Sequence, residues 1–182
     1  MANPKSAYSV STKKEKTDTH IIVVWVDNEA GVLARVVGLF SGRGYNIESL
    51  AVAEVDAKKN ISRITIVTTG TPQVIDQIKL QLKKLVPVHK VADFKRNDKS
   101  VIFKEMALFK VVGNTNKIKK AIKACKKYDA VLLDKTKKSK VIQVTALRRE
   151  IDKMTKNLKK FGLVSVSRTG AVAMTRGEKV FN

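Results

Sequence analysis

Apolar residues along the chain switch repeatedly between the spacing of a strand and the spacing of a helix. Residues 20–26 form a continuous apolar run of strand length, which is typical of a strand buried on both faces. From Val32 to Phe40 the apolar residues recur at helical spacing, and Gly42 and Gly44 end this helix. The pattern therefore predicts a strand followed by a helix.

Three more strands and a second helix complete the first half. Residues 45–54 and 61–69 are predicted as strands, and the second of these is dominated by β-branched residues. Thr71 is the expected cap of a helix that has Pro72 in its first position. Residues 88–94 alternate between apolar and polar and predict a fourth strand. The order of elements is therefore βαββαβ.

The second half repeats this order. Its predicted strands are residues 106–112, 130–133, 141–145 and 163–166. One helix begins at Asn114 or Thr115, and the other covers residues 147–161 and is capped by Gly162. The single cysteine, Cys125, falls on the apolar face of the first of these helices and is predicted to be buried.

This pattern predicts an α+β fold of two ferredoxin-like βαββαβ modules, each an antiparallel sheet with two helices on one face. The first module covers residues 20–95 and the second covers residues 101–182, with a linker at about residues 95–100. Modules of this size bury little surface alone and leave sheet edges unpaired. We therefore expect a homodimer in which sheet edges pair.

The segment at residues 1–19 is predicted to be a disordered leader. It contains acidic residues and lacks the apolar core of a secretory signal, although an organellar transit role stays open. No apolar run reaches about 18 residues, so no membrane span is expected. We expect a cytoplasmic protein with no membrane partner.

The formal net charge is +21, and most of it falls in the second half. Residues 96–182 hold 23 Lys or Arg and 7 Asp or Glu, a net charge of +16. This asymmetry indicates either an anionic partner or a solvated, lysine-rich surface. RNA-recognition domains share the βαββαβ order, but the third strands at residues 61–69 and 141–145 contain no aromatic residue on which a base could stack. We expect no nucleic-acid partner.

The sequence contains none of the residue patterns that carry catalysis or bind metals. His20 and His89 have no partner at metal-ligand spacing, and no nucleophile elbow or phosphate-binding loop occurs. Gly38, Gly42 and Gly44 follow a helix and precede a strand, whereas a dinucleotide fingerprint needs the opposite order. We therefore expect neither catalytic residues nor a metal site.

The turn at residues 27–31 is the strongest candidate for a binding site. It joins a strand to a helix N-terminus, where free N–H groups and the helix dipole favour a carboxylate. Gly31 leaves room for close approach, and the Asn28 amide suits the two charged ends of an amino acid. Asn28 could equally be the N-cap of the helix, and Asn46 could be an ordinary turn residue.

Four stretches of the chain resemble one family, and the resemblance covers about residues 20–179. They are DNEAGVLARVVGLFSGRGYNIESLAVAEVD (27–56) with SRITIVTTG (62–70), then KEMALFKV (104–111), and SRTGAVAMTRGEK (167–179). The run GLFSGRGYNIESL (38–50) is especially typical of this family. The chain resembles the small subunit of acetohydroxyacid (acetolactate) synthase, whose N-terminal domain is an amino-acid-binding ACT domain.

The resemblance implies that valine, or another branched-chain amino acid, binds between the ACT domains of a dimer. The residues implied in effector binding are Asn28, Gly31, Val32, Leu33, Ala34 and Asn46. Asn28 and Asn46 would come from opposite subunits, and the N–H groups of Val32 and Leu33 would hold the carboxylate. Ala34 would leave room for an aliphatic side chain. Ala30 and Ala34 stand where other members often carry Ser.

The resemblance also implies the function and the partner. The chain would be a non-catalytic regulatory subunit in valine, isoleucine and leucine biosynthesis, activating the catalytic large subunit and conferring feedback inhibition by valine. Thiamine diphosphate, Mg²⁺ and FAD would belong to that partner, and this chain would hold no cofactor. A stand-alone ACT protein that senses amino acids for another pathway is the alternative.

Overall fold

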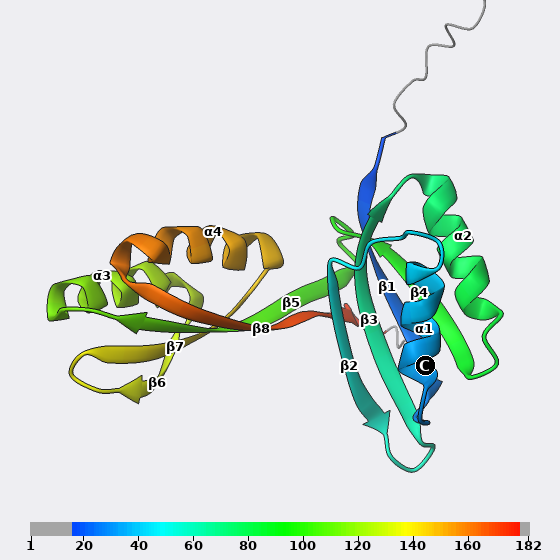
Figure 1. The fold of residues 1–182 in the computed structure, drawn as a ribbon, viewed down its shortest axis with the longest axis horizontal. Helices are drawn as coiled ribbons and strands as arrows, with labels where there is room; N and C mark the ends of the chain where they lie inside the picture. The colour runs from blue at the N-terminus through cyan, green and yellow to red at the C-terminus, as the bar shows by residue number, and fades with distance from the viewer. Residues whose placement is uncertain (1–15, 179–182) are drawn as a thin grey trace, which may run out of the picture.

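The N-terminal module has the predicted order of elements. The structure, a computed structural model, describes residues 16–178. The elements of this module are β1 (Asp18–Asp27), α1 (Val32–Ser41), β2 (Ser49–Asp56), β3 (Ile61–Gly70), α2 (Pro72–Lys83) and β4 (Val88–Lys95). Its four strands form an antiparallel sheet of order β2-β3-β1-β4, with both helices on one face (Figure 1).

The C-terminal module repeats the same topology. Its elements are β5 (Val101–Val112), α3 (Thr115–Cys125), β6 (Val131–Lys135), β7 (Ser139–Ala146), α4 (Arg148–Leu158) and β8 (Leu163–Thr175), with short 3-10 turns after α3 (Lys126–Tyr128) and α4 (Lys159–Phe161). The sheet order is β6-β7-β5-β8, and α3 and α4 lie together on one face (Figure 1). The prediction of two ferredoxin-like βαββαβ modules is confirmed.

Three helix ends are built as the sequence predicts. Thr71 caps α2, because its Oγ1 accepts a hydrogen bond from the N–H of Val74 at 3.4 Å. Asn114 caps α3, and its Oδ1 accepts from the N–H of Lys117 at 2.9 Å. Gly162 ends the turn after α4 with φ +91, a left-handed conformation that favours glycine.

Two strands of the N-terminal module start at other residues than predicted. β1 begins at Asp18, two residues inside the predicted leader, and residues 1–15 of that leader lie outside the described residues. β2 begins at Ser49 rather than at Tyr45, because the N–H of Tyr45 still bonds to the Phe40 carbonyl at 2.9 Å. The placement of Asn46 in a strand is therefore wrong, since it lies in the loop before β2.

The largest error concerns the last strand. The sequence predicts that this strand ends at residue 166, but β8 continues to Thr175 and pairs with β5, whose first residue is Val101 rather than Met106. Together the ends of β5 and β8 form a two-stranded ribbon that leaves the C-terminal sheet and reaches the N-terminal module (Figure 1). Shifts in pairing register between Glu105 and Ala107 accompany this departure.

The ribbon covers the face of the N-terminal sheet that carries no helix. Ile21, Val23 and Val67 of that sheet are buried against Val101 and other ribbon residues, in a cluster separate from the two module cores. β1 therefore has the helices on one side and the ribbon on the other. This confirms that residues 20–26 form a strand buried on both faces.

Cys125 is fully buried in the C-terminal core, as predicted. Its Sγ lies 3.5 Å from the Sδ of Met154, and burial raises the pKa of the thiol to about 11. A thiol in this environment behaves as a small apolar group. Among residues 16–178, no helix is long and apolar enough to span a membrane.

Candidate functional site

The turn between β1 and α1 leaves the start of the helix open. The N-cap of α1 is Gly31, with φ +85, and no side chain caps the helix. A Cβ placed on Gly31 would meet no atom within 4 Å, so the space beside this residue is empty. The first turn of α1 therefore presents its N–H groups and the positive end of its dipole to the surface.

Asn28 does not cap this helix, so the N-cap interpretation is wrong. Its Oδ1 accepts a hydrogen bond from the hydroxyl of the buried Ser62, at 3.0 Å. Its main chain is bonded to Asn60, whose carbonyl accepts from the Asn28 N–H at 2.7 Å and whose Nδ2 donates to the Asn28 carbonyl at 3.3 Å. These contacts hold Asn28 against the start of β3, and its own Nδ2 has no acceptor within residues 16–178.

The N–H groups of α1 differ from the predicted set. The Val32 N–H donates to the Glu29 carbonyl at 3.3 Å, and the Val32 side chain is buried in the core. The N–H groups of Leu33 and Ala34 have no acceptor in the described part of the chain. The donors available to a carboxylate are therefore those of Leu33 and Ala34, rather than those of Val32 and Leu33.

Asn46 lies far from Asn28 within one chain. Its carbonyl accepts a hydrogen bond from Thr68 Oγ1 at 2.7 Å, whereas Asn28 is held by Ser62. Ser62 and Thr68 are six residues apart on β3, which corresponds to roughly 20 Å along a strand. The ten residues of α1 also separate the two asparagines, one at each end of the helix (Figure 1). A single chain therefore does not bring the predicted site together.

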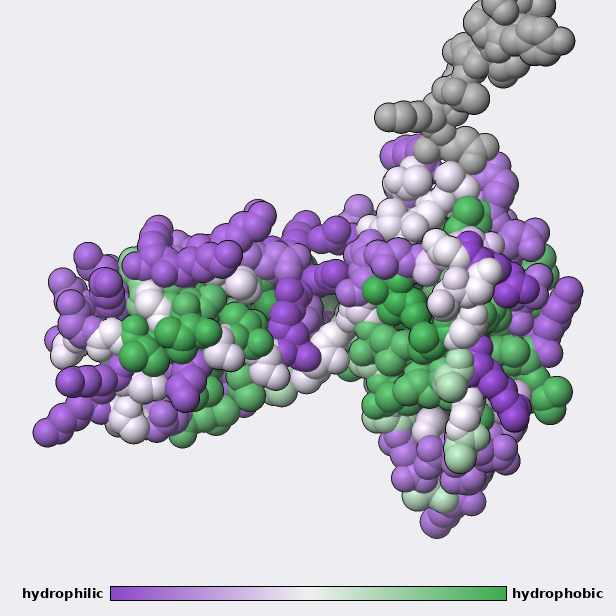
Figure 2. Space-filling view, viewed as in Figure 1, coloured by the Kyte–Doolittle hydropathy of each residue, from purple (hydrophilic) through white to green (hydrophobic). Residues whose placement is uncertain are grey.

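Apolar side chains are exposed on α1 and β2, near this turn. Figure 2 shows hydrophobic residues gathered where α1 and β2 face the viewer. Leu33 on α1 is 38% exposed, and Val52 and Val55 on β2 are 47% and 52% exposed. β2 is also an edge strand of its sheet. Exposed apolar residues beside an unpaired strand edge favour contact with another chain.

The two histidines lie in separate carboxylate pairs. His20 Nδ1 is 2.7 Å from Asp93 Oδ1, and His89 Nε2 is 2.6 Å from Asp27 Oδ1. The described residues contain no group of three or more His, Cys, Asp or Glu side chains that could hold a metal ion. These pairs join β4 to β1 and stabilise the sheet.

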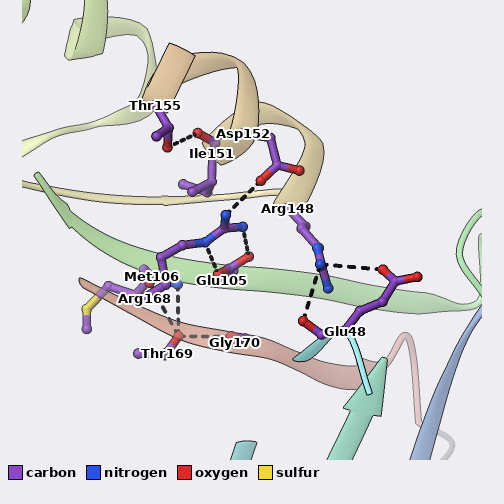
Figure 3. Close-up of polar contacts among 10 residues, drawn as sticks. All are labelled: Glu48, Glu105, Met106, Arg148, Ile151, Asp152, Thr155, Arg168, Thr169 and Gly170. Atoms are coloured by element: carbon purple, nitrogen blue, oxygen red, sulfur yellow. Dashed lines mark hydrogen bonds and ion pairs between the residues drawn. The ribbon is translucent and has the colours of Figure 1, made fainter. Parts of the chain in front are cut away.

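A buried ion pair holds the point where the ribbon leaves the C-terminal sheet. The guanidinium of Arg168 donates to both carboxylate oxygens of Glu105, at 2.6 and 2.8 Å, and to Asp152 Oδ1 at 2.7 Å (Figure 3). Glu105 is only 3% exposed. Hydrogen bonds to Glu105 raise the pKa of Arg168 above its ordinary value. No pattern in the sequence predicts this pairing, because Glu105 and Arg168 are 63 residues apart in the chain.

The two modules also contact each other directly. Arg148, at the start of α4, lies 3.4 Å from both a carboxylate oxygen and the main-chain carbonyl of Glu48 (Figure 3). Arg63 donates to the carbonyl of Ala173 and lies over the Trp25 ring, 5.1 Å from its centroid. Burial lowers the pKa of Arg63. Glu48 stands two residues after Asn46, so the loop before β2 touches the C-terminal module.

Two ferredoxin-like modules, the first with an open helix N-terminus, define a protein of the ACT class. Residues 22–90 match the family model described as the AHAS small subunit-like ACT domain, and residues 104–177 match the model for the small subunit of acetolactate synthase. The chain belongs to the acetolactate synthase small-subunit family. It is thus a regulatory chain rather than a catalytic one, as the resemblance implied.

Individual relatives agree with this assignment. The acetolactate synthase small subunit of Mycobacterium bovis is 35% identical over 88% of this chain and 94% of the relative. A probable acetolactate synthase small subunit of Archaeoglobus fulgidus is 36% identical over 88% of this chain and 98% of its own. The crystal structure of the acetolactate synthase small subunit from Thermotoga maritima superposes with a TM-score of 0.78, at 29% identity, covering 88% of this chain and 99% of the other.

Proposed function

We propose that this chain binds valine, or another branched-chain amino acid, between the ACT domains of two copies. In response it regulates the catalytic large subunit of acetolactate synthase, the enzyme for which its relatives are named. Activation of that subunit and feedback inhibition by valine are the two parts of this regulation. Thiamine diphosphate, Mg²⁺ and FAD are bound by the catalytic partner in this proposal.

The separation of Asn28 from Asn46 is the observation that carries the proposal. An amino acid is far shorter than the roughly 20 Å of strand between their anchoring residues, Ser62 and Thr68. A two-fold axis removes this difficulty, because it places the Asn28 end of one α1 beside the Asn46 end of the other. Each of two equivalent sites then takes one asparagine from each copy.

The chemistry of each half-site suits a small aliphatic amino acid. The free N–H groups of Leu33 and Ala34, with the dipole of α1, favour the carboxylate. The amides of Asn28 and Asn46 supply the remaining polar contacts, including an acceptor for the α-amino group. The empty space beside Gly31 and the exposed side chain of Leu33 leave a small, apolar place for the effector's side chain.

The homodimer also covers apolar surface that a single copy leaves in water. Val52 and Val55 of β2 are exposed on an edge strand, close in sequence to Asn46. Pairing of this edge with a second copy satisfies its main-chain groups and buries those side chains. The effector then lies at an interface, where it stabilises one quaternary arrangement over another.

The loop before β2 offers a route from this interface to the rest of the chain. Asn46 belongs to the half-site, and Glu48 in the same loop is paired with Arg148 of α4. A shift of this loop on effector binding therefore changes a contact with the C-terminal module. Coupling free energies of roughly 1–3 kcal/mol, typical of allosteric proteins, change an affinity about 5–150-fold.

Subunit complementation tests whether the site is shared between copies. Asn28→Ala and Asn46→Ala are expected to abolish saturable valine binding when each variant is titrated alone by calorimetry. Co-expressed with different tags, they form mixed dimers in which one of the two sites has both asparagines. Random pairing then restores roughly a quarter of the wild-type sites. A mixture that binds no valine contradicts a site shared between copies.

Reconstitution tests the regulatory part of the proposal. Adding the wild-type chain to the catalytic large subunit is expected to raise its rate of acetolactate formation, and valine is expected to lower it again. The Asn28→Ala variant should activate while losing the response to valine. A chain that neither activates nor confers inhibition contradicts the proposed role, whatever its affinity for valine.

A further inference from the structure

A cavity lies between the two modules, away from the β1–α1 turn. Its volume is about 610 Å³, and it is bordered by the linker, the ribbon and the start of α4. We call it the junction cleft. The residues that line it are Thr19, Ile21, Glu48, Val67, residues 96–99 and 101–104, residues 147–150, Ala171 and Arg176. Figure 2 shows hydrophilic residues around the notch between the modules.

Unpaired positive charge is concentrated in this cleft. Five lining residues are cationic and have no ion-pair partner in the described part of the chain, namely Arg96, Lys99, Lys104, Arg149 and Arg176. All five belong to the strongly basic segment after residue 95. Cations that line one cavity repel one another, so an anion bound among them is favoured.

The acidic residues of the cleft are already engaged elsewhere. Glu48 is bonded to Thr69 and Arg148, and Glu150 accepts from the N–H of Leu147 at 3.2 Å. Asp98 accepts from the N–H and the hydroxyl of Ser100, bonds that lower the pKa of its carboxyl. These hydrogen bonds do not neutralise the three carboxylates, but the six Lys and Arg residues of the lining outnumber them and leave the cleft with a net charge of +3.

Arg148 adds a donor that lacks a partner. Its Nη2 is bonded to Glu48, but its Nη1 is buried and has no hydrogen-bond partner in residues 16–178 (Figure 3). A buried donor without an acceptor is costly, and a ligand oxygen would relieve that cost. This is a second sign, independent of the net charge, that the cleft accepts an anion.

The other part of the lining is apolar. Ile21, Val67, Val101, Phe103 and Ala171 contribute to it, and all of them belong to the cluster in which the ribbon packs on the N-terminal sheet. The cleft thus combines an apolar part with a cationic rim. Its volume lies within the range of roughly 300–1,000 Å³ found for small-molecule sites.

We propose that the junction cleft binds a small organic anion that carries at least two negative charges on an apolar body. The apolar body lies against the ribbon cluster around Phe103, and the charged end lies among Arg148, Arg149 and Arg176. Such a ligand contacts the start of α4 in the C-terminal module and the linker between the modules. It therefore holds the modules in one arrangement, and it is separate from the proposed valine site.

Binding of 1-naphthyl phosphate to the full chain tests this site, since the probe joins an aromatic body to a dianion. At about pH 8 a phosphate monoester, with a second pKa near 6, is dianionic. Calorimetric titration is expected to show one saturable site per chain, with a dissociation constant of about 10 μM to 1 mM. The double variant Arg149→Gln with Arg176→Gln should have a dissociation constant at least about tenfold higher than that of the wild-type chain.

Matched controls separate the cleft from general attraction to a basic protein. Lys119→Gln with Lys123→Gln removes two charges from α3, in the other part of the C-terminal module, and should leave the affinity unchanged (Figure 1). Inorganic phosphate has the charged group without the aromatic body, and 1-naphthol has the aromatic body without the phosphate. Each should bind at least about tenfold more weakly than 1-naphthyl phosphate.

Three results would overturn the proposal. They are no saturable binding of 1-naphthyl phosphate, equal weakening by both double variants, and binding of inorganic phosphate as tight as that of the probe. Valine titrations on the same variants test the two sites separately. If the chain does not bind valine, the result for 1-naphthyl phosphate at the junction cleft still stands.

Discussion

The two modules build the same β–α turn in opposite ways. In the C-terminal module, Asn114 caps α3 with its own side chain, which accepts from the Lys117 N–H at 2.9 Å. In the N-terminal module the cap is Gly31, without a side chain, and Asn28 is bonded instead to Ser62 on β3. One helix start is closed by the chain itself, and the other is open.

This difference indicates which module can receive an effector. A carboxylate at α3 would have to displace the Asn114 side chain, whereas at α1 the N–H groups of Leu33 and Ala34 are already free. The same topology therefore supports a binding site in one copy and a stable, self-contained turn in the other. Fold alone does not distinguish them, because both turns follow a central strand of the sheet.

The largest expected effect concerns the ion pair of the C-terminal module. Arg168→Met leaves the carboxylate of Glu105 buried without its partner, so the free energy of unfolding should fall by about 3–5 kcal/mol. Urea denaturation of the full chain measures this. Arg148→Met, which breaks the more exposed pair with Glu48, should cost only about 0–1 kcal/mol. Equal losses in the two variants would contradict the role given to burial.

An intermediate effect is expected at two glycines, one in each module. Both Gly31 and Gly162 have positive φ, so alanine at either position costs about 1–2 kcal/mol of backbone strain. At Gly162 a Cβ would also overlap the carbonyl oxygen of Val112, whereas at Gly31 it meets nothing. Gly162→Ala should therefore lower the free energy of unfolding by about 2–4 kcal/mol in total. The comparison fails if Gly31→Ala is the more damaging change in thermal or urea denaturation.

The smallest effect on stability, and the sharpest test of the comparison, comes from the two asparagines. Asn114→Ala removes a helix cap and should cost about 1 kcal/mol while leaving valine affinity unchanged. Asn28→Ala should abolish saturable valine binding, because a ligand contact is lost. Calorimetry with valine and urea denaturation of both variants give the four values needed. Loss of valine affinity in Asn114→Ala would indicate that the effector binds at α3 of the C-terminal module, which contradicts a site at α1.

Local signals explain why most of the fold was predictable. The order of strands and helices follows from the spacing of apolar residues, which depends only on near neighbours in the chain. The caps at Thr71, Asn114 and Gly162 are likewise local, since each satisfies groups within a few residues. The run at residues 20–26 even indicated that something covers both faces of β1.

The candidate site was predictable in its residues but not in its geometry. The turn at residues 27–31 is recognisable from a strand, a glycine and a helix start. The partner of Asn28 was not, because Ser62 lies 34 residues further along the chain. Nor could the sequence show that Val32 donates within its own turn while Ala34 stays free.

By itself the sequence determined the two βαββαβ modules, their core faces and the family. Only the tertiary structure decided the length of β8, the ribbon that covers the N-terminal sheet, and the cleft beside it. The predicted strand stops at residue 166, and only its pairing with β5 shows that residues 167–175 continue the sheet, through Gly170 at φ +80. Contacts of this kind join residues that are distant in the chain, and hydrophobic spacing carries no information about which distant surface will meet them.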